Sequence, residues 1–200
     1  MSQRVGSPTP HTESRRIAIL RAAARLFAAH GFHGVTIEEL GRAVGTTGPA
    51  LYRHFTSKEA VLSAMLLDVS ERLAAGARLR VANAPDATAA LDALLRGHVD
   101  FALAESALIT VHDRELRNVP DPDRHQIRRL QRDYIEQWVA ILAALRPGAN
   151  PAELRVAVHG VFGLLNSTPH STGQVPRESM APLLRAMGRA ALLADTAREA

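Results

Sequence analysis

Cysteine is absent from the 200 residues of the chain. This absence excludes disulfide bonds and thiolate metal sites. Long apolar runs are also missing, since no stretch approaches the roughly 18 residues needed to cross a bilayer. Residues 1–12 lack the apolar centre of a secretory signal. We therefore expect a cytoplasmic protein that does not bind membranes.

Sequence motifs of catalysis are missing as well. The chain has no helix-borne metal-binding motif, no phosphate-cradling glycine loop and no serine-nucleophile motif. We accordingly predict no catalytic residue, no metal site and no cofactor. One enzyme alternative stays open, a metal-dependent hydrolase that uses the adjacent His112 and Asp113.

Lysine occurs only once, as Lys58, beside 23 arginines. The distribution of charge is uneven, because residues 1–60 contain eight basic and four acidic side chains. These residues therefore account for the whole formal net charge of +4, and the remainder of the chain is neutral. This asymmetry indicates a polyanion-binding N-terminal part joined to a neutral body.

Alanine and leucine are abundant and β-branched runs are few, which predicts an all-α fold. Apolar residues recur every three or four positions in residues 14–30, and Gly31 ends that amphipathic helix. Thr36 and Glu39 have the spacing of a capping box at the start of a second, short helix. A third helix begins at Thr46 or Thr47, and a fourth runs from Lys58 to about Val81.

These helices predict three regions. Residues 1–13 are a disordered lead-in, residues 14–60 form a three-helix helix-turn-helix domain, and residues 61–200 form a larger helical domain for ligand binding and dimerisation. Within that larger domain we predict helices at residues 86–104, 106–118, 124–145, 151–166 and 178–194. The two prolines of "NVPDPD" predict a turn, and residues 167–176 a loop.

The third predicted helix is too short to be stable alone. Leu51 and Phe55 are four residues apart and are expected to hold it against its neighbours. Proline is tolerated in the first turn of a helix, so Gly48 and Pro49 mark its start. The residues expected to point outward are Thr47, Gly48, Tyr52, Arg53 and His54. This surface suits insertion into a major groove, with Lys58 placed to bind a flanking phosphate.

The stretch "ILRAAARLFAAHGFHGVTIEELGRAVGTTGPALYRHFTSKEAVL" makes residues 14–66 resemble the DNA-binding domain of the TetR family of transcriptional repressors. The resemblance implies DNA contacts by Thr36, Thr46, Thr47, Gly48, Pro49, Tyr52, Arg53, His54 and Lys58. It also implies a homodimer formed by the two C-terminal helices, and a ligand pocket within about residues 60–165.

Polar and aromatic residues on apolar helix faces are the candidates for ligand contacts: His98, Phe101, His112, Glu115, Tyr134, Trp138 and Asn166. The last two helices have wide apolar faces, from which we predict a dimer interface. Its candidate residues are Leu154, Val158, Val161, Phe162, Leu165, Leu184, Met187 and Ala191.

We expect a repressor that binds a pseudo-palindromic double-stranded DNA operator as a dimer. Two recognition helices about 34–36 Å apart fit successive major grooves. A small, mostly apolar effector, with an acyl-CoA as the candidate, is expected to release the DNA. A ligand-independent architectural DNA-binding protein is the other alternative.

Overall fold

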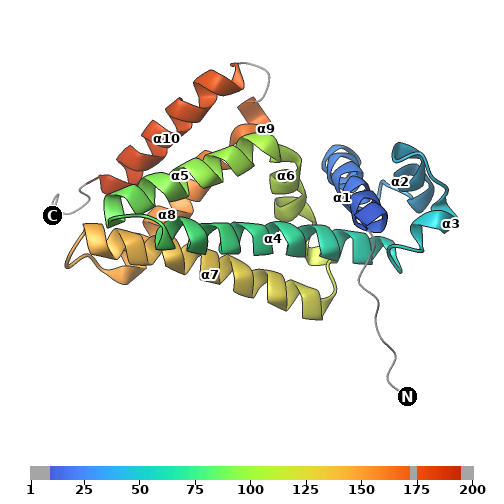
Figure 1. Ribbon diagram of the computed structural model, residues 1–200, viewed down its shortest axis with the longest axis horizontal. Helices are drawn as coiled ribbons and strands as arrows, with labels where there is room; N and C mark the ends of the chain where they lie inside the picture. The colour runs from blue at the N-terminus through green and yellow to red at the C-terminus, as the bar shows by residue number, and fades with distance from the viewer. Residues whose placement is uncertain (1–9, 172–174, 195–200) are drawn as a thin grey trace.

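A computed structural model describes residues 10–171 and 175–194. The described residues form α-helices joined by short connections, so the predicted all-α fold is confirmed (Figure 1). The helices are α1 (Pro10–His30), α2 (Ile37–Ala43), α3 (Gly48–Leu51), α4 (Lys58–Ala82), α5 (Ala87–Ala104), α6 (Ser106–Glu115), α7 (Asp121–Leu145), α8 (Pro151–Leu165), α9 (Thr168–Ser171) and α10 (Arg177–Leu193), with a 3₁₀ turn η1 (Leu116–Asn118) after α6.

The long helix α4 connects the two ends of the molecule. Helices α1–α3 gather around its first turns, whereas α5, α8 and α10 lie toward its other end (Figure 1). Helix α7 packs alongside α4, and α6 packs against α1. The elongated arrangement therefore places the basic N-terminal helices at one end and the C-terminal helices at the other.

Two buried apolar clusters hold this arrangement together. The first includes Phe27 of α1, Leu40 of α2 and Leu62 of α4, but also Val111 of α6. The second joins the later part of α4 to α5, α7, α8 and α10 around the fully buried Trp138. The first core thus continues across residue 60, because α4 contributes to both clusters and α6 packs against α1.

Several predicted boundaries differ from the structure. Helix α1 begins at Pro10, so residues 10–13 of the predicted lead-in are helical, while residues 1–9 lie outside the described part. Helix α7 begins at Asp121 within the predicted turn, since Pro122 occupies its first turn, where a proline N–H is not needed. Helix α9 lies within the predicted 167–176 loop.

Among the described helices, none combines the length and the apolarity that crossing a membrane requires.

Candidate DNA-binding surface and ligand cavity

The predicted capping box starts α2 and is confirmed. The Thr36 hydroxyl accepts a hydrogen bond from the Glu39 backbone N–H at 3.2 Å. The Glu39 carboxylate in turn accepts from the Thr36 backbone N–H at 2.7 Å and from its hydroxyl at 3.0 Å. The Thr36 N–H bond lowers the pKa of Glu39. These contacts fix the chain direction entering α2 and occupy the Thr36 hydroxyl proton within the protein.

Helix α3 is one turn long and is held by two buried side chains. Thr47 caps it by accepting from the Ala50 N–H at 3.4 Å. Leu51 is fully buried and Phe55 is 4% exposed. The helix is shorter than the about eight residues expected from the sequence. The N–H groups of His54 and Phe55 still bond to the Leu51 carbonyl at 2.9 and 3.1 Å. The predicted inward pair is confirmed.

The opposite side of α3 faces solvent. Tyr52 is 53% exposed, Thr47, Pro49 and Arg53 are also exposed, and His54 is half-buried. Half-buried Thr46 precedes them in the turn. A large exposed aromatic beside a guanidinium contributes little to packing, so these side chains are available for a partner. Their contacts with DNA remain a prediction.

Gly48 is an exception to the predicted outward set, because it is buried against α2. A Cβ atom at Gly48 would lie 3.3 Å from Oε1 of Glu38 and 3.5 Å from Cγ2 of Ile37. The glycine therefore makes room for the packing of α2 against α3. The predicted outward position of Gly48 is wrong, whereas its predicted place at the start of the helix, next to Pro49, is confirmed.

Lys58 makes contacts within the protein that the sequence did not predict. Its ammonium group donates to the carbonyl oxygens of Phe32 at 2.9 Å and Val35 at 2.8 Å. It also lies 4.5 Å from the centre of the Phe32 ring. The half-buried lysine thus ties the start of α4 to the loop before α2. Two of its three protons are used internally, so we infer a structural role for Lys58, and its phosphate contact stays a prediction.

Replacing Lys58 with methionine should therefore destabilise the protein more than it changes DNA electrostatics. Two carbonyls lose a charged donor, which we expect to cost about 2 kcal/mol of unfolding free energy. Urea unfolding measures this loss. The salt dependence of DNA binding should stay unchanged. A stable variant whose DNA affinity depends on salt with a slope lower by about one unit would show that Lys58 binds a phosphate.

A cavity of about 540 Å³ lies among α4, α5, α7 and the start of α10. Its apolar wall comes from Leu73 and Ala77 of α4, Leu94 and Phe101 of α5 and Tyr134 of α7. The same cavity is lined by the arginines Arg72, Arg80 and Arg177 and the carboxylates Asp100 and Glu105. Its volume lies within the range of small-molecule sites, and its wall combines apolar surface with charged groups.

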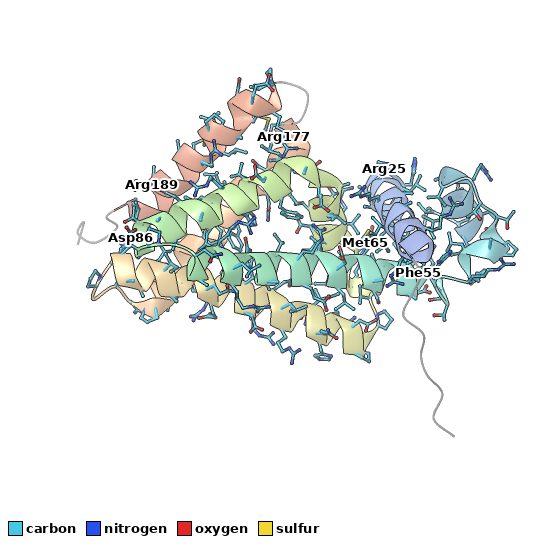
Figure 2. All side chains as sticks on the ribbon, viewed as in Figure 1. Arg25, Phe55, Met65, Asp86, Arg177 and Arg189 are labelled. Atoms are coloured by element: carbon cyan, nitrogen blue, oxygen red, sulfur yellow. The ribbon has the colours of Figure 1, made fainter. Side chains whose placement is uncertain are left out.

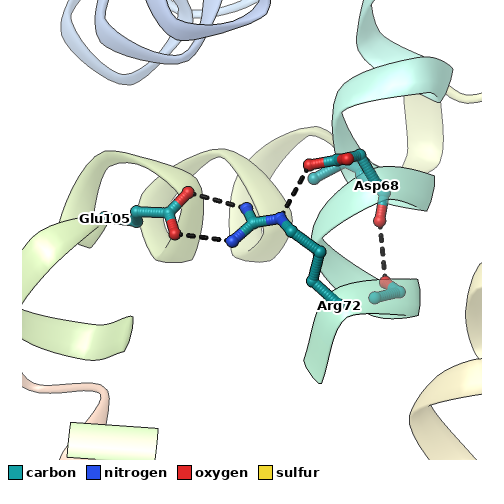
Figure 3. Close-up of polar contacts among 5 residues, drawn as sticks. Asp68, Arg72 and Glu105 are labelled. Atoms are coloured by element: carbon teal, nitrogen blue, oxygen red, sulfur yellow. Dashed lines mark hydrogen bonds and ion pairs between the residues drawn. The ribbon is translucent and has the colours of Figure 1, made fainter. Parts of the chain in front are cut away.

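One wall of the cavity is fixed by a charged cluster. The Arg72 guanidinium donates to both carboxylate oxygens of Glu105, at 2.9 and 2.8 Å, and to Asp68 at 2.9 Å (Figure 3). Hydrogen bonding to Glu105 raises the pKa of Arg72. Glu105 lies at the break between α5 and α6. Arg72 therefore joins α4 to the corner from which α6 begins.

His98 and four of the other six predicted ligand residues form one cluster. The Nε2 of His98 lies 3.1 Å from Oδ1 of Asn166, and its Nδ1 lies 3.0 Å from the Tyr134 hydroxyl. The Phe162 ring stacks on the imidazole at 4.5 Å, and Phe101 and Trp138 contact its edge. Only Phe101 and Tyr134 line the cavity itself, so His98, Trp138 and Asn166 support its wall from behind.

His98 is 3% exposed and neutral at physiological pH, because burial lowers its pKa to about 4. Burial also raises the pKa of the Tyr134 hydroxyl. Both ring nitrogens of His98 are paired when Nε2 donates to Asn166 and Nδ1 accepts from Tyr134. The Tyr134 phenol is thereby held in one orientation at the cavity wall.

His112 and Glu115 do not join this group, so their predicted place in the pocket is wrong. His112 contacts Gln131 and lies 3.5 Å from Asp113. The buried Glu115 accepts from Asn118 at 2.7 Å and lies near Gly31, at the end of α1. His112 thus faces α7, whereas Glu115 faces the end of α1. Within the described ranges, no three acidic or histidine side chains form a metal-binding group, so His112 and Asp113 gain no third ligand.

The arginines of the cavity were not predicted from the sequence, because they do not lie on apolar helix faces. Arg72, Gly76 and Arg80 recur every four residues and share one side of α4. This spacing, with a glycine between two arginines, was the available signal. Arg177 carried no comparable signal, because its place depends on how α10 returns to α5.

Most of the predicted dimer residues lie in the core of the protein and not on its surface. Leu154, Val158, Val161, Leu165 and Leu184 are buried within the protein, and Phe162 stacks on His98. Met187 and Ala191 are exposed. A second stripe on α8 contains Val156, Gly160 and Gly163, and one on α10 contains Leu183 and Met187. Both helices therefore carry apolar surface on two sides, and the core occupies the side that was assigned to the interface.

Family models match both parts of the chain. Residues 19–65 match "Bacterial regulatory proteins, tetR family", and residues 84–182 match "Tetracyclin repressor-like, C-terminal domain". The first match contains the exposed α3 surface and its buried supports. The second contains most of the cavity wall and the start of α10.

Similar proteins agree with these matches. The transcriptional repressor KstR2 of Rhodococcus jostii is 28% identical over 162 residues, which cover 80% of this chain and 78% of that protein. A TetR-family regulator structure from Bordetella parapertussis has a TM-score of 0.79 at 25% identity, covering 88% and 94% of the two chains. The structure of AibR with isovaleryl coenzyme A and operator DNA has a TM-score of 0.71 at 21% identity, covering 86% and 97%. The chain belongs to the TetR family of transcriptional regulators.

Proposed function

We propose that this protein is a repressor that binds a pseudo-palindromic operator as a dimer. A small, mostly apolar ligand causes it to dissociate from that operator. The proposal rests on one observation. A single continuous helix, α4, joins the exposed surface of α3 to the cavity. Helix α4 begins beside α3 and forms the cavity wall at Arg72, Leu73 and Ala77. An architectural DNA-binding protein would not need that cavity.

The DNA contacts are assigned to the exposed side of α3. Thr47, Pro49, Tyr52, Arg53 and His54 supply hydroxyl, aromatic and cationic groups, with Thr46 in the preceding turn. A short helix enters the major groove with its N-terminal residues at the base edges. Leu51 and Phe55 keep that surface rigid, which preserves the contacts without ordering costs.

Dimerisation is assigned to the exposed stripes of α8 and α10. A Cβ atom at Gly160 or Gly163 would meet no atom of the described chain within 4 Å, so a second helix can approach these glycines closely. Leu183 and Met187 are 55% and 46% exposed and supply the apolar surface. A second copy of the chain, placing the same helices against these stripes, would form a four-helix interface.

The ligand is assigned to the cavity. AibR, a protein of the same fold, was solved with isovaleryl coenzyme A. An acyl-CoA matches the combination of apolar wall and arginines here. The protein would then act in the cytoplasm, where acyl-CoA thioesters and the bacterial chromosome are both present.

The ion pair of Arg72 and Glu105 provides a route from the cavity to the DNA-binding surface. Glu105 begins α6, and α6 packs into the apolar cluster that contains Phe27 of α1. A ligand that moves α4 relative to α5 would strain the Arg72–Glu105 pair and shift α6 against α1. The ligand acts by binding the DNA-free arrangement more tightly than the DNA-bound one.

Glu105→Gln should separate ligand binding from DNA release. The substitution removes a carboxylate charge and keeps the side-chain size, so DNA binding without ligand should change less than about three-fold. Release by ligand should require at least about five times more ligand, as expected when coupling falls by about 1 kcal/mol. Fluorescence anisotropy of labelled operator measures both. Asp68→Asn is the matched control, since Asp68 lies on the same helix as Arg72; equal behaviour of the two variants would exclude the corner as the route.

Mass spectrometry of small molecules retained by the purified protein tests the proposed function. We expect an apolar compound, which releases the protein from DNA when added back. Retention of a compound that leaves DNA binding unchanged at saturation would contradict the ligand-responsive function.

A further inference from the structure

Arg80 occupies a position that two glycines make possible. A Cβ atom at Gly76 would lie 2.6 Å from Nη1 of Arg80, and one at Gly97 would lie 2.5 Å from its Nε. A guanidinium can therefore lie against α4 and α5 only because both positions lack a side chain. Glycine in a helix interior costs up to about 1 kcal/mol relative to alanine. The chain thus carries two unfavourable helix residues around one charged group.

The Arg80 guanidinium lines the cavity without a carboxylate partner. No ion pair or hydrogen bond joins it to any acidic side chain of residues 15–171 or 175–194. Arg72, two turns earlier on the same helix, is paired with both Glu105 and Asp68. Arg80 and Tyr134 line the same cavity. Burial raises the pKa of the Tyr134 hydroxyl, and the positive charge of Arg80 partly opposes that rise.

Arg177 adds a second guanidinium from another element. It lies at the start of α10 next to α5 and donates to the Asp100 carbonyl at 3.4 Å (Figure 2). Two carboxylates line the cavity, and Glu105 forms an ion pair with Arg72. Asp100 makes no ion pair with any residue of the described chain. The lining groups leave one positive charge in excess. Guanidinium groups bind carboxylate and phosphate through paired hydrogen bonds.

We infer that Arg80, lying against Gly76 and Gly97, forms with Arg177 an anion-binding site at the cavity wall, and that the cavity selects an amphiphile with a carboxylate or phosphate group. The inference rests on the proposed ligand function of this cavity and narrows the ligand class. The alkyl part lies along Leu73, Leu94 and Phe101. The anionic group meets Arg80, which needs no existing ion pair to be broken.

Equilibrium dialysis with three probes of equal chain length tests this inference. The probes are 1-dodecanol, dodecanoate and dodecanoyl-CoA, which carry no charge, one carboxylate and several phosphate charges. We expect at least one anionic probe to bind about ten times more tightly than the alcohol. Preference for dodecanoate identifies carboxylate recognition, and preference for dodecanoyl-CoA alone identifies phosphate recognition. Equal binding of all three, or no binding, would overturn the inference.

Three variants assign the preference to Arg80. Arg80→Gln should reduce the advantage of the anionic probe to less than about three-fold, while affinity for dodecanol stays unchanged. Gly97→Ala should do the same without lowering the melting temperature, because its methyl group displaces only the flexible end of Arg80. Arg78→Gln removes the same charge two residues away and should leave all three affinities unchanged. An Arg80→Gln protein that still prefers the anionic probe would contradict the proposal.

Release of operator DNA, measured with the same probes, separates this inference from the proposed function. Probes that release DNA equally from wild type and from Arg80→Gln would keep the regulator function and refute the anion site. Binding that depends on Arg80 but never releases DNA would keep the site and refute the ligand-responsive function.

Discussion

Met187→Arg is expected to abolish the dimer and to weaken operator binding by at least about 100-fold. Met187 is 46% exposed on α10, on the stripe that we assign to the dimer interface. A guanidinium buried between two copies would lose its hydration without a partner, at a cost of several kcal/mol. Operator affinity then falls because a monomer holds only one half-site, and linked binding at two sites typically contributes 10²–10⁴ in affinity.

Sedimentation equilibrium and anisotropy with operator DNA measure the two effects. Two substitutions provide controls of different kinds: Ala194→Arg adds charge at the end of α10, and Met187→Leu keeps the apolar surface. Both should leave the dimer intact. If Met187→Arg remains dimeric at micromolar concentration, the α10 stripe is not the interface.

Acid should destabilise the protein by about 3 kcal/mol between pH 6.5 and pH 4 through His98 alone. Its folded-state pKa of about 4 lies below the ordinary value of 6.5, so the unfolded chain binds the proton more readily. The stabilising contribution is therefore complete above pH 6.5 and is lost as the pH falls toward 4. The free energy of unfolding from urea titrations at fixed protein concentration measures this slope.

His98→Gln should remove the slope between pH 6.5 and pH 5. The carboxylates of Glu39, Glu59 and Glu136 cannot replace it, because their pKa values are lowered and their contributions are lost only in stronger acid. Where the variant proves too unstable to measure, the His98 resonance in an NMR titration of the native protein supplies the same information. A titration midpoint near 6.5 would contradict the buried neutral imidazole.

Features that depend on neighbouring residues were predictable from the sequence. The capping box of Thr36 and Glu39, the inward pair Leu51 and Phe55, and the start of α5 after Asp86 all follow from local spacing and cap chemistry. Each involves contacts within four residues, so the sequence pattern determines the geometry directly.

Features that depend on how helices meet were not predictable in the same way. The sequence identified α8 and α10 as apolar on a wide face, but only packing decides that Val158 is buried and Val156 is exposed. Lys58 shows the same limit, since its partners Phe32 and Val35 are more than 20 residues away. The sequence singles out the only lysine, but the direction of its side chain depends on the loop before α2.

The cavity and its surroundings contain residues that the sequence predicted and residues that only helix packing reveals. His98, Tyr134 and Asn166 were selected as polar residues on apolar helices, and the structure brings them together. Arg80 was not selected, because it does not lie on an apolar helix face. Its position depends on Gly76, one turn away, and on Gly97 of the neighbouring helix.

In vitro selection from a library of random DNA duplexes tests whether α3 recognises an operator sequence. We expect enrichment of a pseudo-palindromic sequence, with half-site centres about one helical turn apart and a bound dimer. Tyr52→Ala and Arg53→Ala proteins should lose enrichment while unfolding at the same urea concentration as wild type, because both side chains are exposed. Failure of the wild-type protein to enrich any sequence, or enrichment unaffected by both substitutions, would contradict the assignment of α3 as the DNA-reading element.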